Sequence, residues 1–244
     1  MQLFKSPDGK PVHTIGGSTL ARYYWCSPQA WLAASGIRTP PSEALERGTK
    51  IHADIEKARI TSPQEEEFKH FLSQFLTTDR RGKNIGRPWI DGKTVIEDDI
   101  GWIQTHGMDD FKVDDKRRVV NIEYKTRGSW RVQPITLMPA VFQAQVYMFI
   151  YEPYLLLGGW HWKESWVVWL KRLRGEFKPI GETLVDEYDS AEVQAKIAKI
   201  FDEWNRASEA KTNEERRRIL IPPKKFKCRM CPEVFKKLCP FQNP

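Results

Sequence analysis

The chain has 244 residues, 40% of them hydrophobic, and carries a formal net charge of +7 with only four cysteines. This length is enough to bury one substantial core, and no run of about 18 apolar residues is present that would span a membrane. The excess of lysine and arginine, which crowd residues 216–237, indicates a polyanionic partner. The sparse cysteines and the lack of an apolar signal segment argue against a secreted disulfide framework, so a reducing, cytoplasmic location is expected.

The first third of the chain is predicted to be helical. Residues 18–35 read as a helix interrupted near Pro28, and Ser42 caps a second helix. In residues 64–77, the apolar side chains recur at the spacing of an amphipathic helix. We interpret this apolar stripe as core rather than as a site.

A run of short strands follows, and its last two members carry the chemistry. The predicted strands are residues 93–97, 100–105, 108–113 and 118–125. A polar turn separates the last two, so Asp109 and Glu123 should face each other across a hairpin. Glu123 and Lys125 are two residues apart and should share one face of the strand, with Tyr124 on the other. Asp110, Asp114 and Asp115 are expected to be turn or solvent-facing acids.

Two carboxylates beside a lysine are typical of a metal-dependent phosphodiesterase. Oxygen ligands suit a hard cation such as Mg²⁺ or Mn²⁺, and a positive group can orient the attacking water. The alternative is an ordinary solvated strand face with a cross-strand ion pair. The hairpin alone does not separate the two interpretations.

The second half of the chain completes an α+β order of elements. An apolar helix is predicted over residues 137–151, with Pro139 in its first turn. Gln143 and Tyr147 are four apart and project from one face of that helix, either toward a site or as a buried pair that satisfy each other. Strands after Gly158 should complete the sheet, and a helix with one apolar side follows around residues 193–204.

Three motifs together resemble the PD-(D/E)xK nuclease superfamily, in its RecB-type exonuclease branch. They are Gly107-x-Asp109, Glu123-x-Lys125 and Gln143-x3-Tyr147, and Met108 stands where the family has proline. The resemblance implies a restriction-endonuclease-like core, with a central mixed sheet flanked by helices, in a single nuclease domain over residues 1–244. Its expected parts are the N-terminal helices (18–60), the catalytic sheet with the Gln/Tyr helix (93–172), and a C-terminal helix and tail (190–244).

The same resemblance implies a ligand set. His52, in Gly48-Thr-Lys-Ile-His52, matches the helical histidine of those exonucleases. His52, Asp109, Glu123 and the backbone carbonyl of Tyr124 would then hold Mn²⁺ or Mg²⁺. Lys125 would orient the attacking water, and Gln143 and Tyr147 would contact DNA or that water.

The cysteines form a one-plus-three pattern, with Cys26 near the start and Cys228, Cys231 and Cys239 near the end. Four thiolates suit Zn²⁺ and an iron-sulfur cluster equally, so residue types leave both open. Tyr23-Tyr-Trp-Cys26-Ser-Pro28 resembles the N-terminal signature of the CRISPR-associated adaptation nucleases, and the AddB nuclease domain shares the cysteine pattern. That resemblance implies a 4Fe-4S cluster that joins the N- and C-terminal parts, although the last spacing is longer than usual.

The resemblance further implies a DNA exonuclease that prefers single strands and degrades them with 5′ to 3′ polarity. Two biological settings fit this activity: CRISPR spacer acquisition with an integrase as partner, or phage or cellular recombination and repair with a recombination protein as partner. Endonuclease activity is compatible with the family. Arg127, Trp130 and Arg131 combine cations with an aromatic ring and are expected to bind the strand, unless they form an ordinary loop. Related enzymes form rings, so a homo-oligomer is compatible with the family, and no membrane is involved.

Two other classes of function stay open. One is a non-catalytic module that binds nucleic-acid ends or flaps, with the cysteine site as a scaffold. The other is a four-cysteine zinc protein of transcription, which leaves the Glu-x-Lys hairpin and the Gln-x3-Tyr helix unexplained. The presence of Asp109, Glu123 and Lys125 together favours the enzyme.

Overall fold

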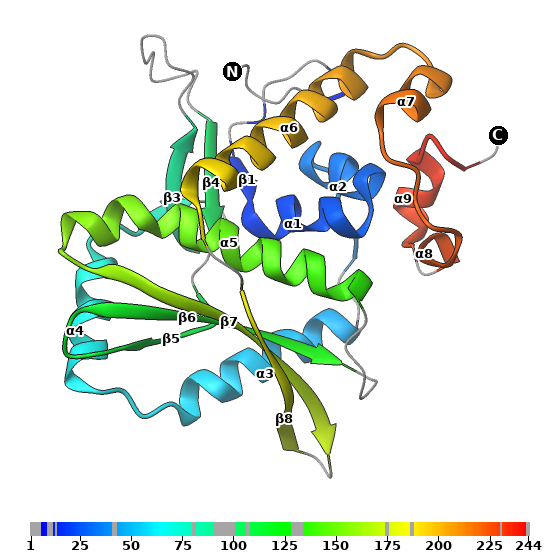
Figure 1. Cartoon of the computed structure of the whole chain (residues 1–244). Coiled ribbons are helices and arrows are strands. Elements are labelled where there is room, and N and C mark those ends of the chain that lie inside the picture. Colours follow the sequence, from blue (N-terminus) through cyan, green and yellow to red (C-terminus); the bar gives the residue numbers. More distant parts are fainter. Residues whose placement is uncertain are drawn as a thin grey trace. The chain divides into compact units, whose positions relative to one another are not determined.

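Figure 1 shows the computed structural model of the chain, which describes residues 6–8, 12, 14–40, 43–79, 82–89, 101–105, 108–127, 134–173, 176–185, 188–229 and 231–242. The chain divides into two compact units, each assembled from separate stretches of sequence. Unit 1 comprises Met1–Pro40, Pro88–Gln104 and Ser190–Pro244, and unit 2 comprises Pro41–Arg87 and Thr105–Asp189. Within the described residues, no helix combines the length and the apolar character needed to cross a membrane. The expectation of one domain over residues 1–244 is not tested by this division.

A mixed sheet with strand order β5-β6-β7-β8 forms the centre of unit 2. Its strands are β5 (Asp110–Val113), β6 (Arg118–Arg127), β7 (His161–Leu173) and β8 (Glu176–Leu184). The pairs β5-β6 and β7-β8 are antiparallel, whereas β6 and β7 are parallel. Parallel neighbours need a crossover connection, and helix α5 (Pro134–Leu157) supplies it. The expected α+β class with a central mixed sheet is confirmed.

Helices cover both faces of this sheet, as Figure 1 shows for α5 and α3 (Glu43–Ala58). Ala140 and Ala144 of α5 pack against Val167 of β7. Ile51 of α3 packs against Val168, the next residue along the strand. Successive strand residues point to opposite faces, so these contacts place α5 on one face and α3 on the other.

Helix α4 (Pro63–Ser73) packs along β5 and begins with a capping box made by Ser62 and Glu65. Phe68 at its centre is fully buried, and the centroid of its ring lies 5.0 Å from the centroid of the Phe111 ring. The helix ends earlier than predicted, because Thr77 already belongs to a hairpin of β2 (Thr77–Asp79) and β3 (Gly82–Trp89), which the sequence did not indicate.

Helix α5 is longer than predicted. Helix α5 begins at Pro134, so Pro139 lies inside the helix and not in its first turn. Pro134 itself takes the first helical position, where a missing N–H costs little. The strand expected at residues 93–97 lies outside the described residues.

Unit 1 is mainly helical. Its helices are α1 (Gly17–Trp25), α2 (Ser27–Ala34), α6 (Ser190–Glu209), α7 (Asn213–Ile219), α8 (Lys225–Arg229) and α9 (Glu233–Leu238). The predicted interruption of the first helix is confirmed, and it falls at Cys26, with Pro28 in the first turn of α2. Strands β1 (Thr14–Gly16) and β4 (Gly101–Thr105) pair in parallel.

The core of unit 1 forms where α1 contacts α6. The predicted apolar side of α6 is buried, and Ile197 and Trp204 are fully buried on it. Glu203 is a buried exception on the same helix. It accepts a hydrogen bond of 2.6 Å from the phenol of Tyr23 and another from the hydroxyl of Ser27. These bonds satisfy a carboxylate that would otherwise be costly to bury.

Candidate active site and cysteine pocket

Strand β6 distributes its side chains between two different environments. Glu123 lies opposite Val167, on the face that α5 covers, and Tyr124 lies opposite Val168, on the face that α3 covers. Lys125 returns to the face of Glu123 because side chains alternate along a strand. The predicted sharing of one face by Glu123 and Lys125 therefore agrees with the strand register.

On the α5 face, four of the predicted site residues form one hydrogen-bonded cluster. Lys125 Nζ contacts Glu123 Oε1, and it also donates to Gln143 Oε1 over 3.0 Å. Gln143 Nε2 donates to Glu123 Oε1 over 2.8 Å and to the Tyr147 hydroxyl over 2.7 Å. Glu123 is only 1% exposed, whereas the Lys125 side chain is 27% exposed. The amide of Gln143 thus links a buried carboxylate to a partly exposed ammonium group.

Tyr147 accepts a hydrogen bond from Gln143, as expected if the two side chains form a pair that satisfy each other. Both residues also belong to the polar cluster around Glu123. Burial raises the pKa of Tyr147, and the negative charges of Glu123 and Asp109 raise it further. The phenol of Tyr147 therefore stays protonated at neutral pH and retains a hydrogen to donate.

Asp109 lies just before β5 and reaches the same region. Its Oδ2 accepts a hydrogen bond of 2.9 Å from the backbone N–H of Tyr124. Its charge also acts on Tyr147, together with that of Glu123. The structure therefore brings Asp109 together with Glu123, Lys125, Gln143 and Tyr147.

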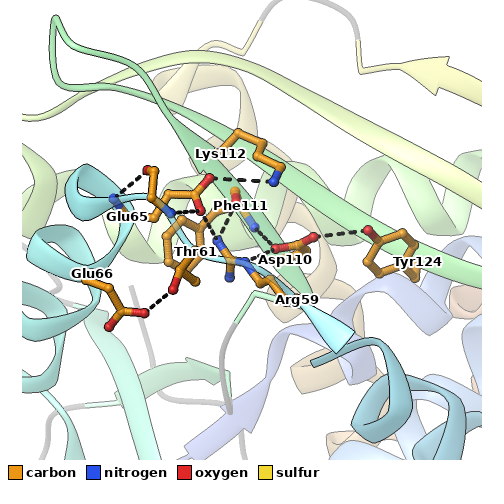
Figure 2. A network of polar contacts seen from close by, with 9 residues as sticks. Arg59, Thr61, Glu65, Glu66, Asp110, Phe111, Lys112 and Tyr124 are labelled. Atoms are coloured by element: carbon orange, nitrogen blue, oxygen red, sulfur yellow. Dashed lines mark hydrogen bonds and ion pairs between the residues drawn. The ribbon is translucent and has the colours of Figure 1, made fainter. Parts of the chain in front are cut away.

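Asp110 was expected to face solvent, and this expectation is wrong. The side chain is 6% exposed and belongs to the network drawn in Figure 2, on the α3 face. Its Oδ1 lies 3.0 Å from Nε of Arg59, and its Oδ2 accepts a hydrogen bond of 3.0 Å from the Tyr124 hydroxyl. Burial raises the pKa of Tyr124, and the charge of Asp110 raises it further, so this phenol also remains a donor. Tyr124 thus holds both neighbouring aspartates, Asp109 through its backbone and Asp110 through its side chain.

Arg59 is a residue that sequence reasoning missed. It follows α3, its guanidinium lies 4.0 Å from the centroid of the Phe111 ring, and Nη2 donates to the Phe111 carbonyl over 2.6 Å. The same nitrogen lies 3.4 Å from Glu65 Oε2, and Glu65 is 3% exposed. Figure 2 shows Arg59 between the two carboxylates of Glu65 and Asp110. The sequence offers one hint, since two adjacent acids on a strand must point to opposite faces and the buried one needs a cation.

Several predicted site residues are not described. His52 lies on α3, but its side chain is outside the described part, as is the side chain of Arg127 at the end of β6. Trp130 and Arg131 also lie outside the described residues. Among the side chains that the structure does describe, no three of His, Cys, Asp or Glu gather closely enough to hold one metal ion. The proposed ligand sets therefore stay predictions.

A cavity of about 560 Å³ lies beside Asp109. Residues from α3, α4, β5 and α5 line it, among them Lys69, Met108 and Tyr151. Of the predicted catalytic residues, Asp109 is the one found among the described residues that line this cavity.

In unit 1, the four cysteines line one small pocket of about 20 Å³. Cys26 separates α1 from α2, Cys228 lies on α8, and Cys231 and Cys239 flank α9. None of these four cysteines forms a disulfide bond. Burial raises the pKa of Cys231 to about 11, and the neighbouring Cys26, Cys239 and Cys228 contribute to this rise. Burial also raises the pKa values of Cys26 and Cys239.

Lys227 anchors the tail beside this pocket. Its ammonium group donates to the carbonyl of Trp25 and lies 4.6 Å from the centroid of the Trp25 ring. The residue is 7% exposed, and burial lowers the pKa of its amine. The contact joins residues that are 202 positions apart, so the C-terminal tail is fixed to the N-terminal helices of unit 1.

No protein-family model matches the chain, and no curated protein matches it. Among solved structures, the chain is similar to a crystal structure from Eubacterium rectale that bears the name "Putative exonuclease". The sequence identity is 12%, the TM-score is 0.42, and the match covers 79% of this chain and 82% of the other. A likeness at this level carries no functional argument.

Proposed function

We propose that the protein is a metal-dependent DNA exonuclease. The observation that carries this proposal is the convergence of Asp109, Glu123, Lys125 and Gln143 next to one strand, with each polar group held by a named partner. A lysine that is tied to a buried carboxylate is expensive to maintain for stability alone.

The donor chemistry of this cluster fits a hard divalent cation. Asp109 and Glu123 offer carboxylate oxygens, which Mg²⁺ and Mn²⁺ prefer, and the carbonyl of Tyr124 lies between Glu123 and Lys125 in the chain. His52 is the fourth proposed ligand. When bound, the ion would polarise the scissile phosphate and lower the pKa of a water molecule.

The chain's own groups have separate tasks in this proposal. Lys125 holds the attacking water and offsets the charge that develops on the phosphate, because its ammonium group is partly exposed and still oriented. Gln143 fixes Lys125 and Glu123 relative to each other through its two amide atoms. Tyr147 stays protonated and orients the amide of Gln143.

The finer parts of the proposal rest on the family resemblance. They are a preference for single-stranded DNA, 5′ to 3′ polarity, strand contacts by Arg127, Trp130 and Arg131, and a role either in CRISPR spacer acquisition or in recombination and repair. An integrase partner would accompany the first role. The formal charge of +7 supports a nucleic-acid substrate in general.

The cysteine pocket is proposed to hold a 4Fe-4S cluster, with Zn²⁺ as the alternative. All four cysteines line one pocket, and four thiolates suit a 4Fe-4S cluster and Zn²⁺ equally. The cluster is preferred because of the family resemblance. We expect the group to be structural, because it would join α8 and α9 to α1 and α2.

The test is degradation of end-labelled single-stranded DNA by anaerobically purified protein in Mn²⁺, Mg²⁺ or EDTA. Lys125→Ala and Asp109→Ala should abolish cutting while DNA binding remains. Asp115→Ala is the matched control, since it removes a carboxylate from the hairpin turn and should cut normally. A folded wild type that binds DNA but does not cut with any metal would overturn the catalytic assignment and leave a binding module for ends or flaps.

A further inference from the structure

The cavity of about 560 Å³ beside Asp109 has no task in the mechanism proposed above. It lies within unit 2, between helix α4 and the start of β5, with Tyr151 of α5 as a further wall. Its volume falls within the range of about 300–1,000 Å³ that is typical of ligand sites. Because Asp109 forms part of its wall, any ligand in it lies next to the proposed reaction centre.

The walls of the cavity differ in character. Leu72, Met108 and Tyr151 present apolar and aromatic groups, and the first and last of these are buried. Lys69 and Ser73 are exposed residues of α4 and add an ammonium group and a hydroxyl at the rim. Aromatic and apolar surface suits the face of a nucleobase, and a lysine beside it suits a phosphate. The combination is that of a nucleotide rather than of a purely apolar ligand.

The charges in the cavity point to Lys69 as the group that is available for phosphate. Arg59 also lines the cavity, but it is paired with Asp110 over 3.0 Å. Glu66 accepts a hydrogen bond from the Thr61 hydroxyl. Lys69 takes part in none of the ion pairs found among the described residues.

We infer that this cavity receives one unpaired nucleotide of the substrate strand, with its base against Leu72, Met108 and Tyr151 and its phosphate beside Lys69. The inference rests on the proposed nuclease function, because Asp109 is what sets the cavity beside the reacting phosphate. The charge of Asp109 alone repels a phosphate. A divalent cation at that carboxylate reverses the repulsion, so occupancy of the cavity depends on a divalent cation.

The experiment measures fluorescence anisotropy of a labelled oligothymidylate, with Ca²⁺ and then with EDTA. Ca²⁺ takes the same oxygen ligands as Mg²⁺, and a gel confirms that the strand stays intact. Two variants test the phosphate contact and the space for the base. Lys69→Met removes the ammonium group, and Ser73→Trp fills the cavity. Lys116→Met is the matched control, because Lys116 is exposed in the hairpin turn and does not line the cavity.

In Ca²⁺, we expect each cavity variant to bind the strand about tenfold more weakly than wild type, and Lys116→Met to stay within about threefold. For Lys69→Met, the slope of log affinity against log salt should fall by about 0.7, the value for one lost contact to a single-strand phosphate. In EDTA the differences between variants should shrink. A thermal melt of each variant confirms that it is folded.

Wild-type affinity of both folded cavity variants in Ca²⁺ would overturn the inference. If Lys125→Ala still abolished cutting in that case, the nuclease assignment would stand without the cavity. If the cavity variants bound weakly but wild type never cut, the cavity would stand and the nuclease assignment would fall. Competition by free dTMP as strong as that by the oligothymidylate would also overturn the inference, because the cavity would then take a mononucleotide rather than a strand.

Discussion

Replacing Arg59 by methionine tests how the buried network beside the candidate site contributes to stability. Methionine keeps much of the length and the apolar stem, and it removes the guanidinium between Glu65 and Asp110. These carboxylates are 3% and 6% exposed. Removing one partner of a buried ion pair typically costs about 3–5 kcal/mol, because the remaining charge is left without compensation.

The remaining contacts show which of the two carboxylates loses more of its charge compensation. Glu65 keeps Lys112, whose Nζ lies 3.7 Å away, and a hydrogen bond from the backbone of Ser62. Asp110 keeps the N–H of Phe111 and the phenol of Tyr124, but no cation among the contacts described for it. We therefore expect Arg59→Met to lower the free energy of unfolding by about 3–5 kcal/mol, mainly through Asp110. Adding Asp110→Asn in the same chain should restore part of this loss.

The assay is urea unfolding followed by tryptophan fluorescence, for the two single variants and the double variant. Arg218→Met is the control, since Arg218 forms an exposed ion pair with Glu214 and its loss should cost about 0.5 kcal/mol or less. The reasoning is refuted if Arg59→Met behaves like the control. It is also refuted if the double variant is no more stable than Arg59→Met alone.

Three further outcomes are expected. Gln143→Leu should lower the rate of single-strand cleavage about 10- to 100-fold while DNA affinity in EDTA stays unchanged, and a parallel loss of affinity would show that Gln143 holds DNA instead. Cys26→Ala should remove most of the bound iron or zinc and make the tail after α6 sensitive to trypsin, whereas wild-type metal content would exclude Cys26 as a ligand. Burial and Glu203 raise the pKa of Tyr23 above its ordinary value of 10.0, so the folded state holds this proton more tightly than the unfolded state. The contribution of this proton to the free energy of unfolding is complete below pH 10 and is lost as the pH rises beyond that, so the stability of Tyr23→Phe should fall less steeply above pH 10 than that of wild type. The two slopes should differ by up to about 1.4 kcal/mol per pH unit. Urea unfolding at pH 9, 10 and 11 measures them, and equal slopes would contradict this prediction.

The sequence was informative wherever local periodicity decides the structure. Alternation in β6 placed Glu123 and Lys125 on one face, and the spacing of Gln143 and Tyr147 placed them on one side of α5. These relations depend only on the geometry of a strand and of a helix. The capping box of α4 was not predicted, although Ser62 and Glu65 have the required spacing.

The sequence was least informative where a residue far away in the chain determines whether a side chain is buried. Asp109 and Asp110 are adjacent and chemically identical, and burial of Asp110 depends on Arg59, which lies 51 positions earlier. The hairpin of β2 and β3 was missed because its residues lack the alternation of apolar and polar side chains that marks a strand. Pro139 was misplaced because a proline is tolerated inside a helix that is buried by its neighbours, so its position did not mark the helix start.

The pairing of Glu203 with Tyr23 and Ser27 has a consequence for the synthesis of the chain. The partners are 180 and 176 residues apart, and all of unit 2 lies between them in the sequence. At about 5–20 residues per second, the ribosome makes α6 some 10–35 s after α1 and α2.

During that interval α6 is absent, so the hydroxyl groups of Tyr23 and Ser27 lack their acceptor Glu203, and α1 lacks the helix that it contacts. Leu20 and Trp31, which are buried in the finished unit, then remain without α6. All residues of unit 2 are made before α6, because unit 2 ends at Asp189. The middle of the chain can therefore fold before the core of unit 1 is complete, and until α6 is made the N-terminal helices expose apolar surface that favours aggregation on the ribosome.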